Sequence, residues 1–92
     1  MTGDTALRQI RELAKDSSRV IRTTHARERM IERGISIQQV FTCLRAGIII
    51  EGPAPNAHGN WQVTMMARQS GDEITCVVVI DWETRLLIVT VY

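Results

Sequence analysis

Long apolar runs are missing from this chain of 92 residues. No stretch approaches the roughly 20 residues that a transmembrane helix needs, and the first residues include Asp4 in place of a signal peptide's apolar segment. Hydrophobic residues make up 45% of the chain and charged residues 23%, which are values of globular proteins and not of disordered ones. We therefore expect one soluble, cytoplasmic domain with a single modest core and no membrane partner.

Metal-ligating residues are also few. The two cysteines, Cys43 and Cys76, are far apart in the sequence and form no CxxC pair, and the chain has only two histidines. We expect reduced thiols, no metal site and no cofactor. A glycine-rich phosphate loop, a nucleophile elbow and the carboxylate pair of a glycosidase are all missing.

The net positive charge of the chain is small, and nearly all of its basic residues are arginines. The net charge is only +1, so nucleic acid would have to bind to a local cluster and not to the field of the whole protein. Lys15 is the single lysine against ten arginines. Arginine suits phosphate and carboxylate because its guanidinium is a planar fork, although high-GC coding would produce the same bias without functional meaning.

Helical signals fill the first half of the chain. Apolar residues at helical spacing predict a helix over residues 5–15, with Asp4 as its N-cap. A later helix begins at a capping box formed by Ser36 and Gln39, and Gly47 ends it.

Strand signals fill the second half. Residues 19–22 predict either an edge strand or a simple lead into the next helix, and residues 48–51 predict a short strand closed by Gly52 and Pro53. Further strands are predicted over residues 61–68, 73–82 and 85–92. The order of elements predicts an α+β fold, in which two to three N-terminal helices pack on one face of an antiparallel, three- to four-stranded sheet.

Alternation along the last strand predicts its two faces. One face should carry Leu87, Val89 and Val91, and the other Leu86, Ile88, Thr90 and Tyr92. The residues predicted to be largely buried are Met30, Phe41, Leu44, Val78 and Ile80. Cys43 is expected near solvent.

Residues 23–35 predict the helix around which the chain is organised. Thr23 or Thr24 can cap its start, and Gly34 can end it in the left-handed conformation. At about 100° per residue, three of its side chains form a stripe about 80° wide. They are His25, Arg29 and Arg33. Such a stripe favours an anion nearby, but the arginines could equally pair with acids elsewhere in the fold.

Hydroxyl groups of the last strand can complete a site with this stripe. Thr90 and Tyr92 would lie side by side at the strand's end and could converge with His25 and Arg29. In the first turn of its helix, His25 is a candidate general base. In the alternative interpretation His25 only bonds its own turn and the hydroxyls are ordinary strand residues. His58 is expected to be solvated.

Three segments match a known pattern in order and spacing. They are T-x-H-A-x-x-R-M-x-x-R-G-I, a following G-I-I-I-E strand and the closing I-V-T-V-Y. Over about residues 23–92 the chain resembles small bacterial and phage proteins of domain-of-unknown-function family 4258. The resemblance implies a domain over residues 19–92, preceded by a helical extension over 1–18. It also implies a fold similar to the RelE-like and MqsR-like toxin ribonucleases. Members of the family often resemble toxins that are encoded beside a zinc-finger, helix-turn-helix antitoxin.

The family's marked positions imply a site. They fall on Thr24, His25, Arg29, Arg33, Gly34, Thr90 and Tyr92. The leading hypothesis is a toxin-type, metal-independent endoribonuclease (an mRNA interferase-like hydrolase) with RNA and a cognate antitoxin as partners. Its catalytic residues would be His25, Arg29 and Tyr92, and its RNA phosphate ligands would be Thr24, Arg33 and Thr90. The alternative is a non-catalytic protein-binding module, such as an immunity or adaptor protein. The chain departs from RelE-like toxins in being nearly neutral, and the sequence leaves the oligomeric state open.

Overall fold

Three α-helices and five strands make up the described part of the chain. The structure is a computed structural model that describes residues 1–81 and 84–92. Its elements are α1 (Gly3–Leu13), a 3-10 turn (Ser17–Arg19), β1 (Val20–Arg22), α2 (Thr24–Arg33), α3 (Ile37–Ala46), β2 (Ile48–Pro55), β3 (Trp61–Gln69), β4 (Asp72–Asp81) and β5 (Arg85–Val91). The α+β class is confirmed.

The sheet has one strand more than the prediction allowed. Its order is β1-β5-β4-β3-β2. The four later strands form an antiparallel meander, as expected. The short β1 is a genuine edge strand and pairs parallel to β5, with Ile21 opposite Leu87. The prediction of a purely antiparallel sheet was wrong because a three-residue edge strand has too little sequence to show its direction.

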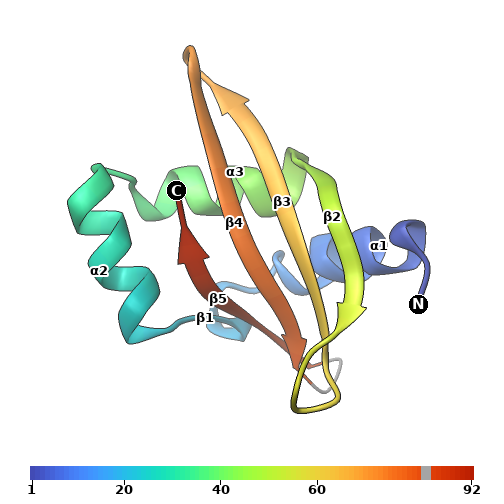
Figure 1. Cartoon of the computed structure of the whole chain (residues 1–92). Coiled ribbons are helices and arrows are strands. Elements are labelled where there is room, and N and C mark those ends of the chain that lie inside the picture. Colours follow the sequence, from blue (N-terminus) through green and yellow to red (C-terminus); the bar gives the residue numbers. More distant parts are fainter. Residues whose placement is uncertain (82–83) are drawn as a thin grey trace.

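The helices cover one face of this sheet. Figure 1 shows α1 and α3 behind the strands, while α2 stands beside β5 and β1. Between helices and sheet lies a core whose central members include Ile10, Leu44, Met65, Val78 and Leu86. Within residues 1–81 and 84–92 the opposite face carries no helix, and we call it the open face. None of the described helices is long and apolar enough to span a bilayer.

Local capping signals predicted the helix boundaries well. The side chain of Thr23 caps α2, Gly34 ends it with φ 66°, and Ser36 and Gln39 form the expected capping box of α3. The predicted cap of α1 was wrong: Thr2, and not Asp4, accepts a hydrogen bond from the backbone of the first turn. Either residue type can cap, so the helix simply begins earlier than its apolar stripe.

Two strands differ from their predictions. β2 runs on to Pro55 instead of ending before Gly52, because it lies at a sheet edge where proline needs no ladder partner for its missing N–H. β4 is described only to Asp81, so the predicted strand end at Trp82 lies outside the described residues.

The predicted faces of β5 were wrong at its end. Leu86, Ile88 and Val91 are all fully buried against the helices, so the alternation changes phase after Ile88. The cause is an irregularity in the pairing with β4, where Val77 lies opposite Thr90 but the next residue, Val78, lies opposite Ile88. Val89 is the extra residue of this bulge, and the bulge turns Thr90 and Tyr92 onto the open face.

The predicted core was nearly right. Met30, Leu44, Val78 and Ile80 are buried as expected. Phe41 is only half-buried at the edge of the core, with the guanidinium of Arg45 lying over its ring.

Cys43 was misplaced by the prediction. It is fully buried beside Cys76, and both thiols are free. A hydrogen bond to Cys43 and burial raise the pKa of the Cys76 thiol, which keeps that thiol protonated near neutral pH.

Candidate functional site

The first turn of α2 is fastened to the last strand. The backbone N–H of Thr23 donates to the carbonyl oxygen of Ile88 at 3.1 Å. Its hydroxyl lies 3.1 and 3.0 Å from the carbonyl oxygens of Ile88 and Val89, which share its single proton, and it accepts the N–H of Ala26 at 3.1 Å. These bonds bring the start of α2 to the bulge of β5, immediately before Thr90.

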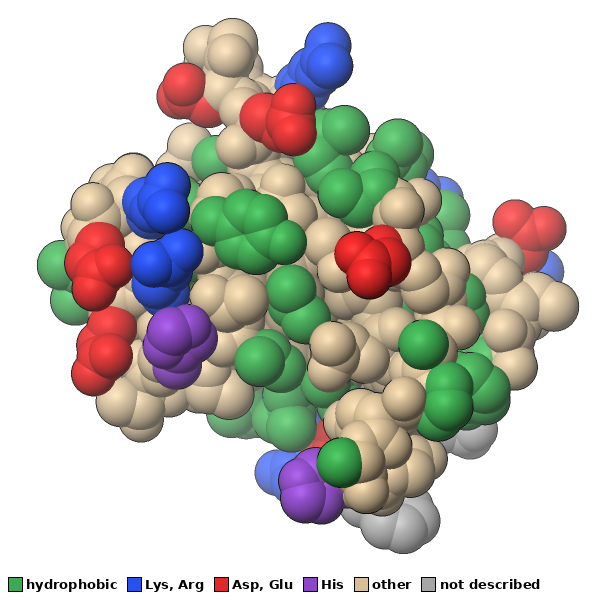
Figure 2. Space-filling model, in the orientation of Figure 1, with side chains coloured by type: hydrophobic (Ala, Val, Ile, Leu, Met, Phe, Trp, Pro, Cys, Tyr) green, Lys and Arg blue, Asp and Glu red, His purple; other side chains and the backbone are tan. Residues whose placement is uncertain are grey.

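The predicted stripe lies on the side of α2 that borders the open face. Figure 2 shows a histidine and two basic side chains in a column over α2, with acidic side chains on the helix's outer flank. His25 is the only histidine of α2, and both His25 and Arg33 are exposed. Arg29 is half-buried, with 30% of its side chain accessible to solvent. The stripe therefore combines two exposed groups with one that is partly withdrawn from water.

Arg29 is the unusual member of this stripe. Its Nη1 atom lies 3.7 Å from a carboxylate oxygen of Glu32, a long contact with an exposed partner. Its Nε–H is buried and has no hydrogen-bond partner among the described residues. Buried N–H groups are nearly always paired in folded proteins, since an unmade bond costs about 1–3 kcal/mol. The geometry thus leaves the buried Nε–H unpaired, while other parts of the Arg29 side chain remain accessible to a ligand.

The start of α2 adds backbone donors to this guanidinium. The first N–H groups of a helix have no partner within the helix. The hydroxyl of Thr23 satisfies the N–H of Ala26, which leaves the N–H groups of Thr24 and His25 directed out of the helix end. A helix N-terminus of this kind attracts anions through those N–H groups and the helix dipole. Thr24 was predicted to bind the RNA phosphate, and its side chain is exposed. The hydroxyl of the neighbouring Thr23 is instead used in hydrogen bonds within the protein.

Thr90 and Tyr92 share the open face at the end of β5. Thr90 is half-buried and lies opposite Val77. Tyr92 is 48% exposed, and its backbone exchanges two hydrogen bonds with Thr75 that hold the end of the chain on the sheet. Figure 1 shows the C-terminus on the side of the sheet where α2 stands. The stripe and the two hydroxyls thus come from elements that touch, joined through Thr23.

A model of one protein family matches residues 22–92, and it is described as a domain of unknown function, DUF4258. The chain belongs to the DUF4258 family. The match includes every residue of the candidate site and agrees with the resemblance seen in the sequence. No curated protein and no solved structure matched the chain.

Helix α1 lies outside the DUF4258 match but inside the fold. Its buried side chains include Ala6, Ile10 and Leu13, and all belong to the same core as the sheet residues. The guanidinium of Arg11 donates to the carbonyl oxygen of Gly47 at 3.3 Å, which ties α1 to the start of β2. The helix is therefore packed as part of the structure, whatever its place in the family.

The remaining titratable groups gather into no further candidate site. Across residues 1–81 and 84–92, no group of three His, Cys, Asp or Glu side chains is placed to hold a metal ion. His58 is exposed in the turn before β3, where the side chain of Asn56 accepts its N–H. A polar cleft between β2 and β3 was missed by sequence reasoning, because it is created by irregular pairing that no local pattern reveals.

Proposed function

We propose that this DUF4258 protein is a toxin-type, metal-independent endoribonuclease. The observation that carries the proposal is the buried, unpartnered Nε of Arg29 beside a helix N-terminus and an exposed histidine. A phosphodiester supplies the anionic oxygens that such a donor lacks, and a rotation of the Arg29 side chain would bring the buried Nε into contact with them. Single-stranded RNA also supplies its own nucleophile, the 2′-hydroxyl, so the protein needs only to position the phosphate and move protons.

The proposed reaction is an internal phosphoryl transfer. The 2′-oxygen forms a bond to phosphorus, and the bond from phosphorus to the 5′-oxygen of the next nucleotide breaks. His25 takes the proton of the 2′-hydroxyl, and a hydroxyl group at the end of β5 (Tyr92 or Thr90) donates a proton to the leaving oxygen. Arg29, Arg33 and the N–H groups at the start of α2 hold the phosphate and stabilise its growing negative charge. The products are a 2′,3′-cyclic phosphate and a 5′-hydroxyl end.

Inducible expression in a bacterial host tests this proposal most simply. Wild-type protein should arrest growth, and His25→Ala should remove the arrest at equal protein level. Purified wild-type protein should cleave RNA in the presence of a metal chelator and leave cyclic phosphate ends. Cleavage that is retained in full by His25→Ala, or that is abolished by the chelator, would contradict the mechanism.

A second candidate is a non-catalytic protein-binding module. The small net charge of +1 and the exposed apolar side chains Ile21, Ile48 and Ile50 favour a protein partner. In that case the stripe pairs with acidic residues of the partner. The neighbouring gene separates the two candidates: a zinc-finger antitoxin supports the nuclease, while an effector supports the binding module. The nuclease proposal includes the antitoxin as partner and the cytoplasm as location, since its RNA substrate is there.

A further inference from the structure

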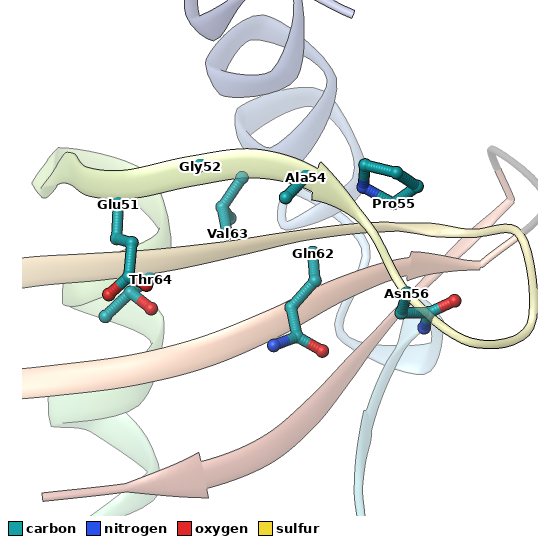
Figure 3. A pocket seen from close by; sticks show the side chains of 8 residues that line it. All are labelled: Glu51, Gly52, Ala54, Pro55, Asn56, Gln62, Val63 and Thr64. Carbon is teal, nitrogen blue, oxygen red and sulfur yellow. The ribbon is translucent and has the colours of Figure 1, made fainter.

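A cleft opens where β2 separates from β3. Glu51 lies opposite Thr64 and Ala54 lies opposite Gln62, so two residues of β2 face one residue of β3 between these pairs. The extra chain bows outward and leaves a cavity of about 110 Å³. Figure 3 shows the side chains that line it: Glu51, Gly52, Ala54, Pro55, Asn56, Gln62, Val63 and Thr64.

The backbone of Gly52 keeps this cleft in shape. Its φ of 89° lies in the left-handed region that residues with a Cβ avoid. A Cβ at this position would also lie 2.6 Å from the carbonyl oxygen of Gln62, which belongs to the rigid backbone of β3. The bow of β2 therefore requires glycine here, and the cleft is a fixed feature of the fold.

Polar side chains on the open face give the cleft its chemistry. Figure 3 shows Glu51, Thr64 and Gln62 pointing to the same side of the strands. In the described part of the chain, these three side chains make no hydrogen bond to protein. Asn56 closes one end and is held in place, because its side-chain oxygen accepts the N–H groups of His58 and Asn60 at 3.0 and 2.9 Å. The cleft offers a carboxylate, two amides and a hydroxyl to a ligand.

We infer that this cleft binds a guanine base of the RNA strand, an inference that rests on the proposed nuclease function. Guanine presents two adjacent N–H donors on its Watson–Crick edge, which match the two oxygens of the Glu51 carboxylate. Its O6 acceptor, next to those donors, matches an amide N–H such as that of Gln62. Adenine and cytosine place a ring-nitrogen acceptor beside their amino group, and uracil places carbonyls on both sides of its single N–H. Adenine, cytosine or uracil would therefore place an acceptor atom against the Glu51 carboxylate, and the repulsion would weaken binding.

Strand pairing places this cleft in line with the candidate active site. Glu51 pairs with Thr64, Thr64 with Val77, and Val77 with Thr90, so these four residues form one row on the open face. Three inter-strand steps of about 4.8 Å give roughly 14 Å between the row's ends. A short single-stranded segment can cover that span, with its phosphate at α2 and an unstacked base in the cleft.

Base-dependent binding tests the inference without requiring cleavage. We would measure fluorescence anisotropy with short uridine oligonucleotides that carry one central guanine, adenine or cytosine. Their 2′-oxygens would be methylated, which removes the nucleophile. Wild-type protein should bind the guanine oligonucleotide about tenfold more tightly than the other two. Glu51→Gln should lose this preference, while Glu73→Gln, a matched change of an exposed glutamate on β4, should keep it.

The outcomes separate this inference from the proposed function. Arg29→Ala should weaken binding of every oligonucleotide and leave the guanine preference intact. Binding and cleavage without a base preference would overturn the cleft assignment and leave the nuclease standing. A guanine preference that survives in Glu51→Gln, at an unchanged melting temperature, would also overturn it. If wild-type protein binds no oligonucleotide, the nuclease proposal and this inference both fail.

Discussion

Helices α2 and α3 have the same length but are held in the fold by different means. Each has ten residues and begins at a hydroxyl cap. α3 lies on the sheet and buries Val40, Cys43 and Leu44 completely, whereas α2 buries only Ala26 and Met30 and stands at the edge. Apolar packing secures α3, while α2 depends on hydrogen bonds from Thr23 to β5. A helix that is fastened at one end can present polar side chains along its length, and α2 presents the candidate site.

The largest loss of stability is expected when a packed side chain of α3 is truncated. Leu44→Ala should lower the free energy of unfolding by about 2–5 kcal/mol, because it leaves a cavity in a fully packed region. Chemical denaturation followed by circular dichroism measures this loss. A loss below about 1 kcal/mol would mean that α3 does not rest on packing.

A smaller effect is expected at the anchor of α2. Thr23→Val keeps the shape of the side chain but removes the hydroxyl, and with it the cap and the side-chain contacts with the carbonyl oxygens of Ile88 and Val89. The backbone bond to Ile88 remains, and the change should cost about 1–2 kcal/mol. Amide hydrogen exchange should show faster exchange confined to α2 and the end of β5. Thr24→Val, next to it in sequence but exposed, is the matched control and should change little. If Thr23→Val and Thr24→Val changed the stability and the amide exchange equally, Thr23 would have no special role in fastening α2 to β5.

The sequence predicted the parts of the fold that depend on neighbours along the chain. The caps at Ser36 and Gly34 and the stripe on α2 follow from spacing within one helix, and the structure has them where they were expected. The direction of β1 and the reach of β2 depend on partners elsewhere in the sheet, and they were missed or shortened.

Residues on β5 show the same limit within the candidate site. Thr90 and Tyr92 were correctly placed on one face because residues two apart share a side of a strand. Their grouping with Leu86 and Ile88 was wrong, since the bulge at Val89 arises from pairing with β4. The cleft beside Glu51 was out of reach for the same reason, as two strands and an irregular register create it.

The central claim is that α2 carries a phosphate-binding site built around Arg29, and paired variants of α2 test it most directly. Arg29→Ala and Arg27→Ala each remove one arginine from the same helix, but Arg27 is exposed and lies outside the stripe. Arg27→Ala should change the free energy of unfolding by about 0.5 kcal/mol or less, as surface substitutions do. Arg29 is half-buried, so circular dichroism is used first to establish that Arg29→Ala is folded at the assay temperature. Arg29→Ala should slow RNA cleavage by at least about a hundredfold, the loss expected of a donor to a developing oxyanion, while Arg27→Ala should cleave RNA like wild type. Equal cleavage rates in the two variants, with both folded, would contradict it.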